Sequence, residues 1–175
     1  MLRPLAALLL AAAPVAASAP ALSTGAWWEK ITVTFSADGK PQSCRYETSG
    51  RAGQSPECKL MASGGKPLSQ RPVGAQDEFS TITFERRFTP GSAVENPAIH
   101  PGDTLLGREV MALAIDAAGQ VTGCTTVATS GDAAPDYGCT EAKAERFEVS
   151  ADRAAAVIRE GLLTVLVYGH SEHVA

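Results

Sequence analysis

An internal duplication restricts the fold of this chain more than any other feature of its sequence. Residues 31–58, ITVTFSADGKPQSCRYETSGRAGQSPEC, and residues 111–139, MALAIDAAGQVTGCTTVATSGDAAPDYGC, share one pattern. Each reads as an alternating strand, a turn ending in Gly, a second strand containing Cys, a Ser-Gly pair and a second Cys. Four landmarks recur at an offset of 80 or 81 residues: Gly39 and Gly119, Cys44 and Cys124, Gly50 and Gly131, Cys58 and Cys139. A repeated spacing of this kind predicts two copies of one structural unit.

Each copy reads as two strands, a helix and a final strand. Ile31, Val33 and Phe35 alternate with polar residues, which is the period of a half-buried strand, and the Asp-Gly of SADGK favours a hairpin turn. The segment TEAKAERF (140–147) lacks Gly and Pro and predicts one or two helical turns. The apolar runs 80–88 and 162–170 would close the copies. The sequence therefore predicts an α+β fold of two tandem ββαβ domains.

Composition shifts give the predicted boundaries. The Pro- and Gly-rich stretch TPGSAVENPAIHPGDTLL (89–106) has no periodicity and reads as a connection. We expect the first domain over 27–90, a linker over 91–106, the second domain over 107–170 and a tail over 171–175.

The four cysteines can pair in three ways. Because each copy should carry its own bond, the duplication favours Cys44–Cys58 and Cys124–Cys139. A bond that closes a loop of this length stabilises by roughly 3 kcal/mol. The chain has no CxxC motif, and no second Cys or His lies close enough to build a zinc site. We interpret the cysteines as structural and expect no metal and no cofactor.

The N-terminal segment predicts export. Residues 1–21 combine Arg3 with the apolar run PLAALLLAAAPVAASA, which is shorter than a membrane-spanning helix and contains Pro14. We read them as a signal peptide cleaved after Ala17 or Ala21, with an uncleaved membrane anchor as the alternative. Paired cysteines fit an oxidising compartment. The net charge of −4, without a basic run, argues against nucleic acid as a partner.

In its second copy the chain resembles the C-terminal domain of the TonB energy-transducer family. The segment GREVMALAIDAAGQVTGCTTVATSG (107–131) matches the family's strand, acidic-Gly turn and second strand ending in Ser-Gly. Asp136 lies where the family has an Asp, Phe147 corresponds to its aromatic, and Leu162–Val167 to its last strand. The resemblance covers about 60 residues, and the first half is a degraded copy. The family's membrane helix and Pro-rich spacer have no counterpart here, since STGAWW follows the leader almost directly.

This resemblance implies a non-enzymatic periplasmic protein that binds extended peptide segments by β-strand addition. The expected partners are TonB-dependent outer-membrane receptors, their energising complex or other envelope proteins; membrane contact is expected only if the leader is retained. The alternative is a disulfide-stapled structural module, including a homodimer formed through the same edge. Both functions need an apolar edge strand, for which the sequence offers Leu162, Leu163, Thr164, Val165, Leu166, Val167 and Tyr168.

Two charged patterns have structural interpretations. His170 and His173 form an HxxH pattern that could bind a metal, but a solvated C-terminal tail is expected. In FERRF (84–88), strand alternation puts Arg86 on one face and Glu85 with Arg87 on the other, as expected for an exposed, charge-paired strand.

Other polar and aromatic residues also have structural interpretations. Trp27 and Trp28 are expected to pack over the first strand, with a partner anchor as the alternative. The aspartates Asp38, Asp116 and Asp136 fit turn or cap positions. Ser49 and Ser130 lie in the Ser-Gly turns, where neither a nucleophile elbow nor a nearby His supports a hydrolase.

Overall fold

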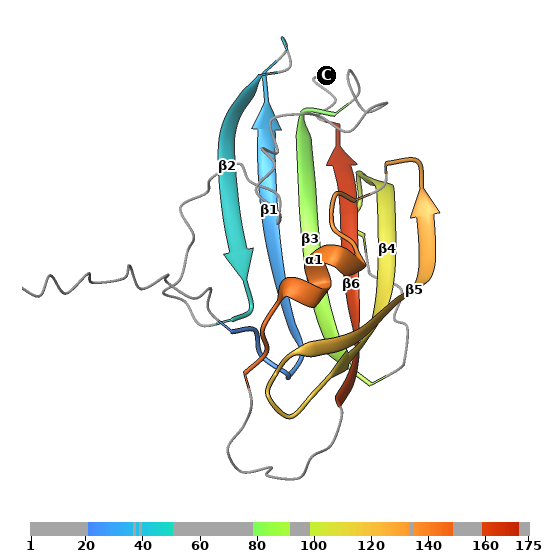
Figure 1. Ribbon diagram of the computed structural model, residues 1–175. Helices are drawn as coiled ribbons and strands as arrows, with labels where there is room; N and C mark the ends of the chain where they lie inside the picture. Colours follow the sequence, from blue (N-terminus) through green and yellow to red (C-terminus); the bar gives the residue numbers. More distant parts are fainter. Residues whose placement is uncertain are drawn as a thin grey trace, which may run out of the picture.

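The described part of the chain folds into one antiparallel β-sheet with a short helix on one face (Figure 1). The computed structural model describes residues 21–36, 38, 40–50, 79–91, 99–133, 135–148 and 159–171. Its strands are β1 (Trp27–Phe35), β2 (Pro41–Thr48), β3 (Thr81–Pro90), β4 (Asp103–Ile115), β5 (Val121–Gly131) and β6 (Arg159–His170), and its helix is α1 (Cys139–Ala144). This antiparallel sheet with one short helix is compatible with the predicted α+β class.

The strand order is β2-β1-β3-β6-β4-β5, with every neighbouring pair antiparallel. Each half contributes a hairpin whose first strand also pairs with the last strand of that half. Cys44 lies opposite Val33 in the first hairpin, and Cys124 lies opposite Leu113 in the second. The duplication is therefore visible as a repeated strand order and a repeated register.

The two halves join through their last strands, β3 and β6, which pair along ten residue positions from Thr81↔His170 to Pro90↔Gly161. Two separate tandem domains are consequently not shown, because 27–90 and 107–170 supply neighbouring strands of one continuous sheet. The predicted linker is also too long: β4 begins at Asp103, inside the 91–106 segment. The residues from 59 onward that would form a first-half helix lie outside the described residues.

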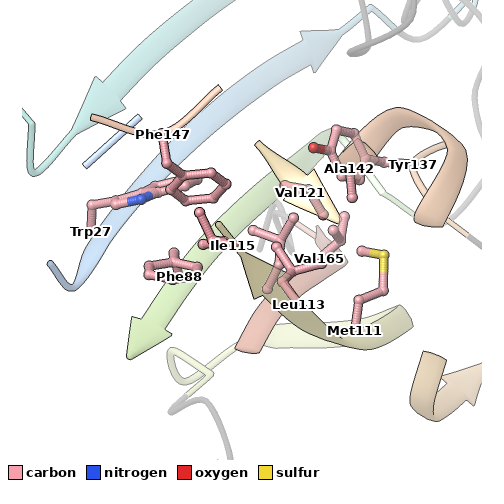
Figure 2. Close-up of a cluster of buried hydrophobic side chains, with 11 residues drawn as sticks. Trp27, Phe88, Met111, Leu113, Ile115, Val121, Tyr137, Ala142, Phe147 and Val165 are labelled. Carbon is pink, nitrogen blue, oxygen red and sulfur yellow. The ribbon is translucent and has the colours of Figure 1, made fainter. Parts of the chain in front are cut away.

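The main hydrophobic core lies between the sheet and α1. Met111, Leu113 and Val165 project from the sheet beneath Tyr137 and Ala142 (Figure 2). At the other end of this core, Trp27 stacks on Phe88, with ring centroids 6.2 Å apart, and Phe147 packs against Phe88 at 5.0 Å. A six-residue helix is too short to be stable alone, so it depends on this packing.

Two glycines of the second copy explain its Gly and Ser-Gly landmarks. Gly119 has φ 75° in the turn between β4 and β5, where the Asp116 carboxylate accepts hydrogen bonds from the Ala118 and Gln120 amides. Gly131 has φ 82° at the end of β5, which lets the chain fold back so that the Ala133 amide donates to the Leu106 carbonyl at 3.0 Å. Both conformations favour glycine over residues with a Cβ.

Candidate functional site

The segment predicted to be a partner-binding edge lies inside the sheet. β6 pairs with β3 on one side and with β4 on the other, and its residues from Leu162 to Tyr168 are buried except Thr164. The prediction of an edge position was wrong. The physical reason for the inner position of β6 is that an apolar strand such as LLTVLVY gains the most free energy of burial when both of its faces are covered and both of its edges are paired.

The outer edges of the sheet are instead β2 and β5. β2 has the features by which proteins protect a strand edge: Pro41 begins it, and Arg45 and Glu47 form an exposed ion pair at 3.3 Å. Proline provides no backbone donor, and charged side chains oppose the burial that an added apolar strand would cause. We regard β2 as the protected edge.

β5 has a different surface. Its eleven residues, VTGCTTVATSG, include no charged residue and no proline. Most of its side chains are exposed, and Val127 is one of the exposed large hydrophobic residues, with 49% of its surface accessible. Hydroxyl-bearing and β-branched residues such as these favour an extended backbone. Within the described part of the chain, no strand pairs with the outer edge of β5.

Two bulges bend β5 (Figure 1). Thr122 and Val127 each fall between consecutive pairs with β4, so they are the extra residues of the register shifts. The stretch from Gly123 to Thr126 keeps regular pairing between them. A bulge limits how far a neighbouring strand can follow the edge, so this regular stretch sets the register of any added strand.

A disulfide anchors the regular stretch of β5 to the helix. Cys124 and Cys139 are bonded, with Cα atoms 5.5 Å apart, as the duplication predicts. Cys44 is also disulfide-bonded; Cys58, its predicted partner, lies outside the described residues. Among the described cysteines none is free. The Gly138 amide donates to the Glu141 carboxylate at 2.9 Å, which closes the first turn of α1.

A partly buried charge cluster joins the two halves on the helix-bearing face. Arg86 of β3 donates to Glu29 of β1 and, at 2.7 Å, to Glu145 after α1, while its guanidinium lies 4.8 Å from the Tyr137 ring. The Tyr137 hydroxyl donates to the same Glu145 oxygen at 2.9 Å. Burial alone would lower the pKa of Arg86, but Glu29, Tyr137 and Glu145 raise it well above its usual value. The cluster neutralises the partly buried guanidinium of Arg86.

A second charged group lies on the opposite face. Glu85 is 1% exposed; it accepts hydrogen bonds from Arg87 and, at 3.0 Å, from the Tyr168 hydroxyl, and Lys30 lies 3.6 Å away. The alternation predicted for FERRF is confirmed, but its expected exposure was wrong, because the neighbouring strands cover this region and the charges are paired. Burial, followed by the charge of Glu85, raises the pKa of Tyr168.

The two adjacent tryptophans differ in burial. Trp27 is 8% exposed, and its indole N–H donates to the Ser23 carbonyl at 2.9 Å, whereas Trp28 is 36% exposed beneath the Lys30 ammonium. Packing is thus confirmed for Trp27 only, because successive strand residues point to opposite faces.

Of the residues in the HxxH pattern and the Ser-Gly turns, His170, Ser49 and Ser130 lie in the described part of the chain. His170 ends β6 and contacts Asp103 at 2.9 Å, and His173 lies outside the described residues. The Ser49 hydroxyl accepts from the Trp28 amide at 2.8 Å, and Ser130 is exposed on β5. The described ranges contain no group of three His, Cys, Asp or Glu side chains that could hold a metal ion.

Sequence reasoning missed β5 as the edge because its polar composition resembles an ordinary solvated strand. The signal available was the absence of charge over eleven residues in a chain with 19% charged residues. No helix in the described ranges is long and apolar enough to cross a membrane. Comparisons with protein-family models, curated proteins and solved structures found no match.

Proposed function

We propose that this chain is an exported, non-enzymatic protein-binding module that receives an extended segment of a partner protein by strand addition at β5. The observation that carries the proposal is the contrast between the edges: β5 is uncharged and without proline, while β2 begins with Pro41 and carries the Arg45–Glu47 pair. An unprotected edge offers backbone donors and acceptors to an added strand.

The Cys124–Cys139 bond supports this role because it fixes the regular stretch of β5 against α1. A strand that is already held extended loses less conformational entropy on binding than a mobile one. The predicted leader and the disulfide chemistry support export, and we propose the periplasm as the location.

The sequence resemblance supplies the partner class. In this proposal residues 27–90 and 107–170 are two repeats related to the TonB C-terminal domain, fused through β3 and β6. The partners would then be outer-membrane transport receptors, their energising complex or other envelope proteins, and neither a metal nor a cofactor takes part.

A second candidate function is a structural module that does not bind transport proteins. The pairing of β3 with β6 favours this structural function, because the apolar strand β6 already pairs within the chain and is not available to pair with another protein. Such a module would need no further partner at β5.

The test compares the two edges directly. Thr125→Lys places a charge on β5, and Ser43→Lys places the same charge on an exposed position of β2. The oxidised mature protein and both variants are used to capture proteins from an envelope extract, followed by quantitative mass spectrometry. We expect the T125K variant alone to lose its partner, and amide exchange at β5 to slow in the wild-type complex.

Enrichment of TonB-dependent receptors, lost in the T125K variant, would support the transport role. Equal capture by both variants would show that β5 is not the binding edge. Capture of no other protein would favour the structural module.

A further inference from the structure

The two glycines of β6 that lie beside a phenylalanine support its ring, whereas Gly107 of β4 and Gly131 of β5 lie against backbone atoms. A Cβ on Gly161 of β6 would lie 2.3 Å from Cζ of Phe88, and a Cβ on Gly169 would lie 2.5 Å from Cγ of Phe79. No side chain could occupy either position without moving the ring. In both places the bare backbone of a glycine is the surface on which a phenyl ring packs.

Gly123 of β5 is a strand glycine without such a ring. Among the described residues, only Cβ of Ala114, at 3.2 Å, lies within 4 Å of the place that a Cβ on Gly123 would take. The backbone does not require glycine here, since Gly123 is not one of the positive-φ glycines. The position is partly exposed.

The pairs of β4 and β5 on this face around Gly123 are small and uncharged. Gly123 pairs with Ala114, and the next pair on the same face is Thr125 with Ala112. Because the neighbouring Cys124 points toward α1 to form its disulfide, Gly123 and Thr125 face the side of the sheet without the helix. A flat apolar side chain could lie across the strand here against Ala114, with the charged residue of this row, Glu160 of β6, one strand beyond Ala114.

We propose that the segment received by β5 is uncharged and carries an aromatic side chain, whose ring lies across Gly123 against the Ala114 methyl group. This inference rests on the proposed strand addition at β5. A ring placed over an edge glycine covers backbone that has no side chain of its own, and an aromatic cross-strand neighbour contributes more than a small one. The partner's ring thereby covers Gly123 in the way that Phe88 and Phe79 cover Gly161 and Gly169 of β6.

The test uses two short, acetylated and amidated peptides of alternating threonine and valine, one with a central phenylalanine and one with alanine in its place. We expect the phenylalanine peptide to bind the oxidised full chain roughly two- to fivefold more tightly. In the Gly123→Val variant the strand edge remains, since valine favours strands, but a side chain covers the site of the ring. The preference for phenylalanine should then disappear while both peptides still bind.

A spectroscopic readout does not depend on that variant. The ring should shift the methyl resonances of Ala112 and Ala114 through its ring current when the phenylalanine peptide is added, and the alanine peptide should not. Binding of both peptides with equal affinity and without this shift would overturn the aromatic inference and leave strand addition intact. If neither peptide binds the wild-type chain, while amide exchange at β5 stays unchanged, strand addition itself fails.

Discussion

The two halves of this chain have the same strand order but differ in what holds their strands. The first half contributes β2-β1-β3 and the second β5-β4-β6, with Cys44 and Cys124 at equivalent cross-strand positions. In the second half, α1 covers the sheet, the Cys124–Cys139 bond ties it to β5, and Gly131 turns the chain back onto β4. The first half presents a charged, proline-bounded edge, and the second an uncharged one.

Under the proposed function, the two copies of this duplicated unit have unequal tasks. The pairing of β3 with β6 makes the halves one sheet, and Arg86 of the first half is neutralised partly by Glu145 of the second. The stability of each half therefore depends on the other, while the outer edges stay free to differ. Each of the following predictions tests one part of this comparison.

The largest expected effect comes from the charge cluster at the junction. Replacing Arg86 by Met leaves the partly buried carboxylates of Glu29 and Glu145 without their cation, which destabilises a protein by up to about 3–5 kcal/mol. Urea unfolding would measure the loss, with Arg45→Met as the control because Arg45 is exposed. A loss for R86M as small as that of the control would mean that the cluster does not hold the halves together.

The next effect concerns the disulfides. Removing the 124–139 bond by the double substitution Cys124→Ala and Cys139→Ala frees a loop of 15 residues, for a loss of roughly 3 kcal/mol. The matched double substitution of Cys44 and Cys58 measures the first half in the same way. Peptide mapping without reduction should recover 44–58 and 124–139, and a 44–124 bond would contradict two self-contained copies.

The tyrosines predict a loss of stability in alkali. Burial, as the leading cause, raises the pKa values of Tyr137 and Tyr168 above the ordinary value of 10.0. Burial also raises the pKa of Tyr46, which is less deeply buried. The folded chain thus favours the neutral phenols, so their contribution to stability is complete below pH 10 and is lost as the pH rises above it. Absorbance at 295 nm should show no native phenolate before unfolding begins. Phenolate formation near pH 10 in the folded protein would contradict the burial of these rings.

Much of each half could be predicted from the sequence, and the junction could not. Period-two alternation located β1 and β4, the Asp-Gly and Ala-Gly turns gave the hairpins, and the offset gave the 124–139 bond. These features depend on neighbours within one copy. The predicted pairing of the apolar strand β6 with a foreign strand was wrong. A run such as LLTVLVY indicates only that the strand is buried, and does not show whether it pairs with β3 or with a strand of another protein.

The candidate edge was missed for a related reason. β5 was read as an ordinary second strand, because a single sequence does not reveal which strand ends outermost when two copies join. Only after β3 and β6 are paired do β2 and β5 become the edges, and only then does their difference in charge have a functional meaning. The wrong position of β6 and the missed edge at β5 both result from long-range strand pairing, which local sequence patterns do not encode.

The smallest expected effect lies in the hairpin turns and tests how far the repeat extends. Gly119 adopts φ 75°, a conformation that costs residues with a Cβ about 1–2 kcal/mol, so Gly119→Ala should destabilise by that amount in urea unfolding. Gly39 is its counterpart at an offset of 80 residues. If the turns of both copies are alike, Gly39→Ala will cost the same, and the halves are equivalent down to their turns. A clearly smaller cost at Gly39 would place the divergence of the first copy already at its hairpin, next to the β2 edge that the second copy does not share.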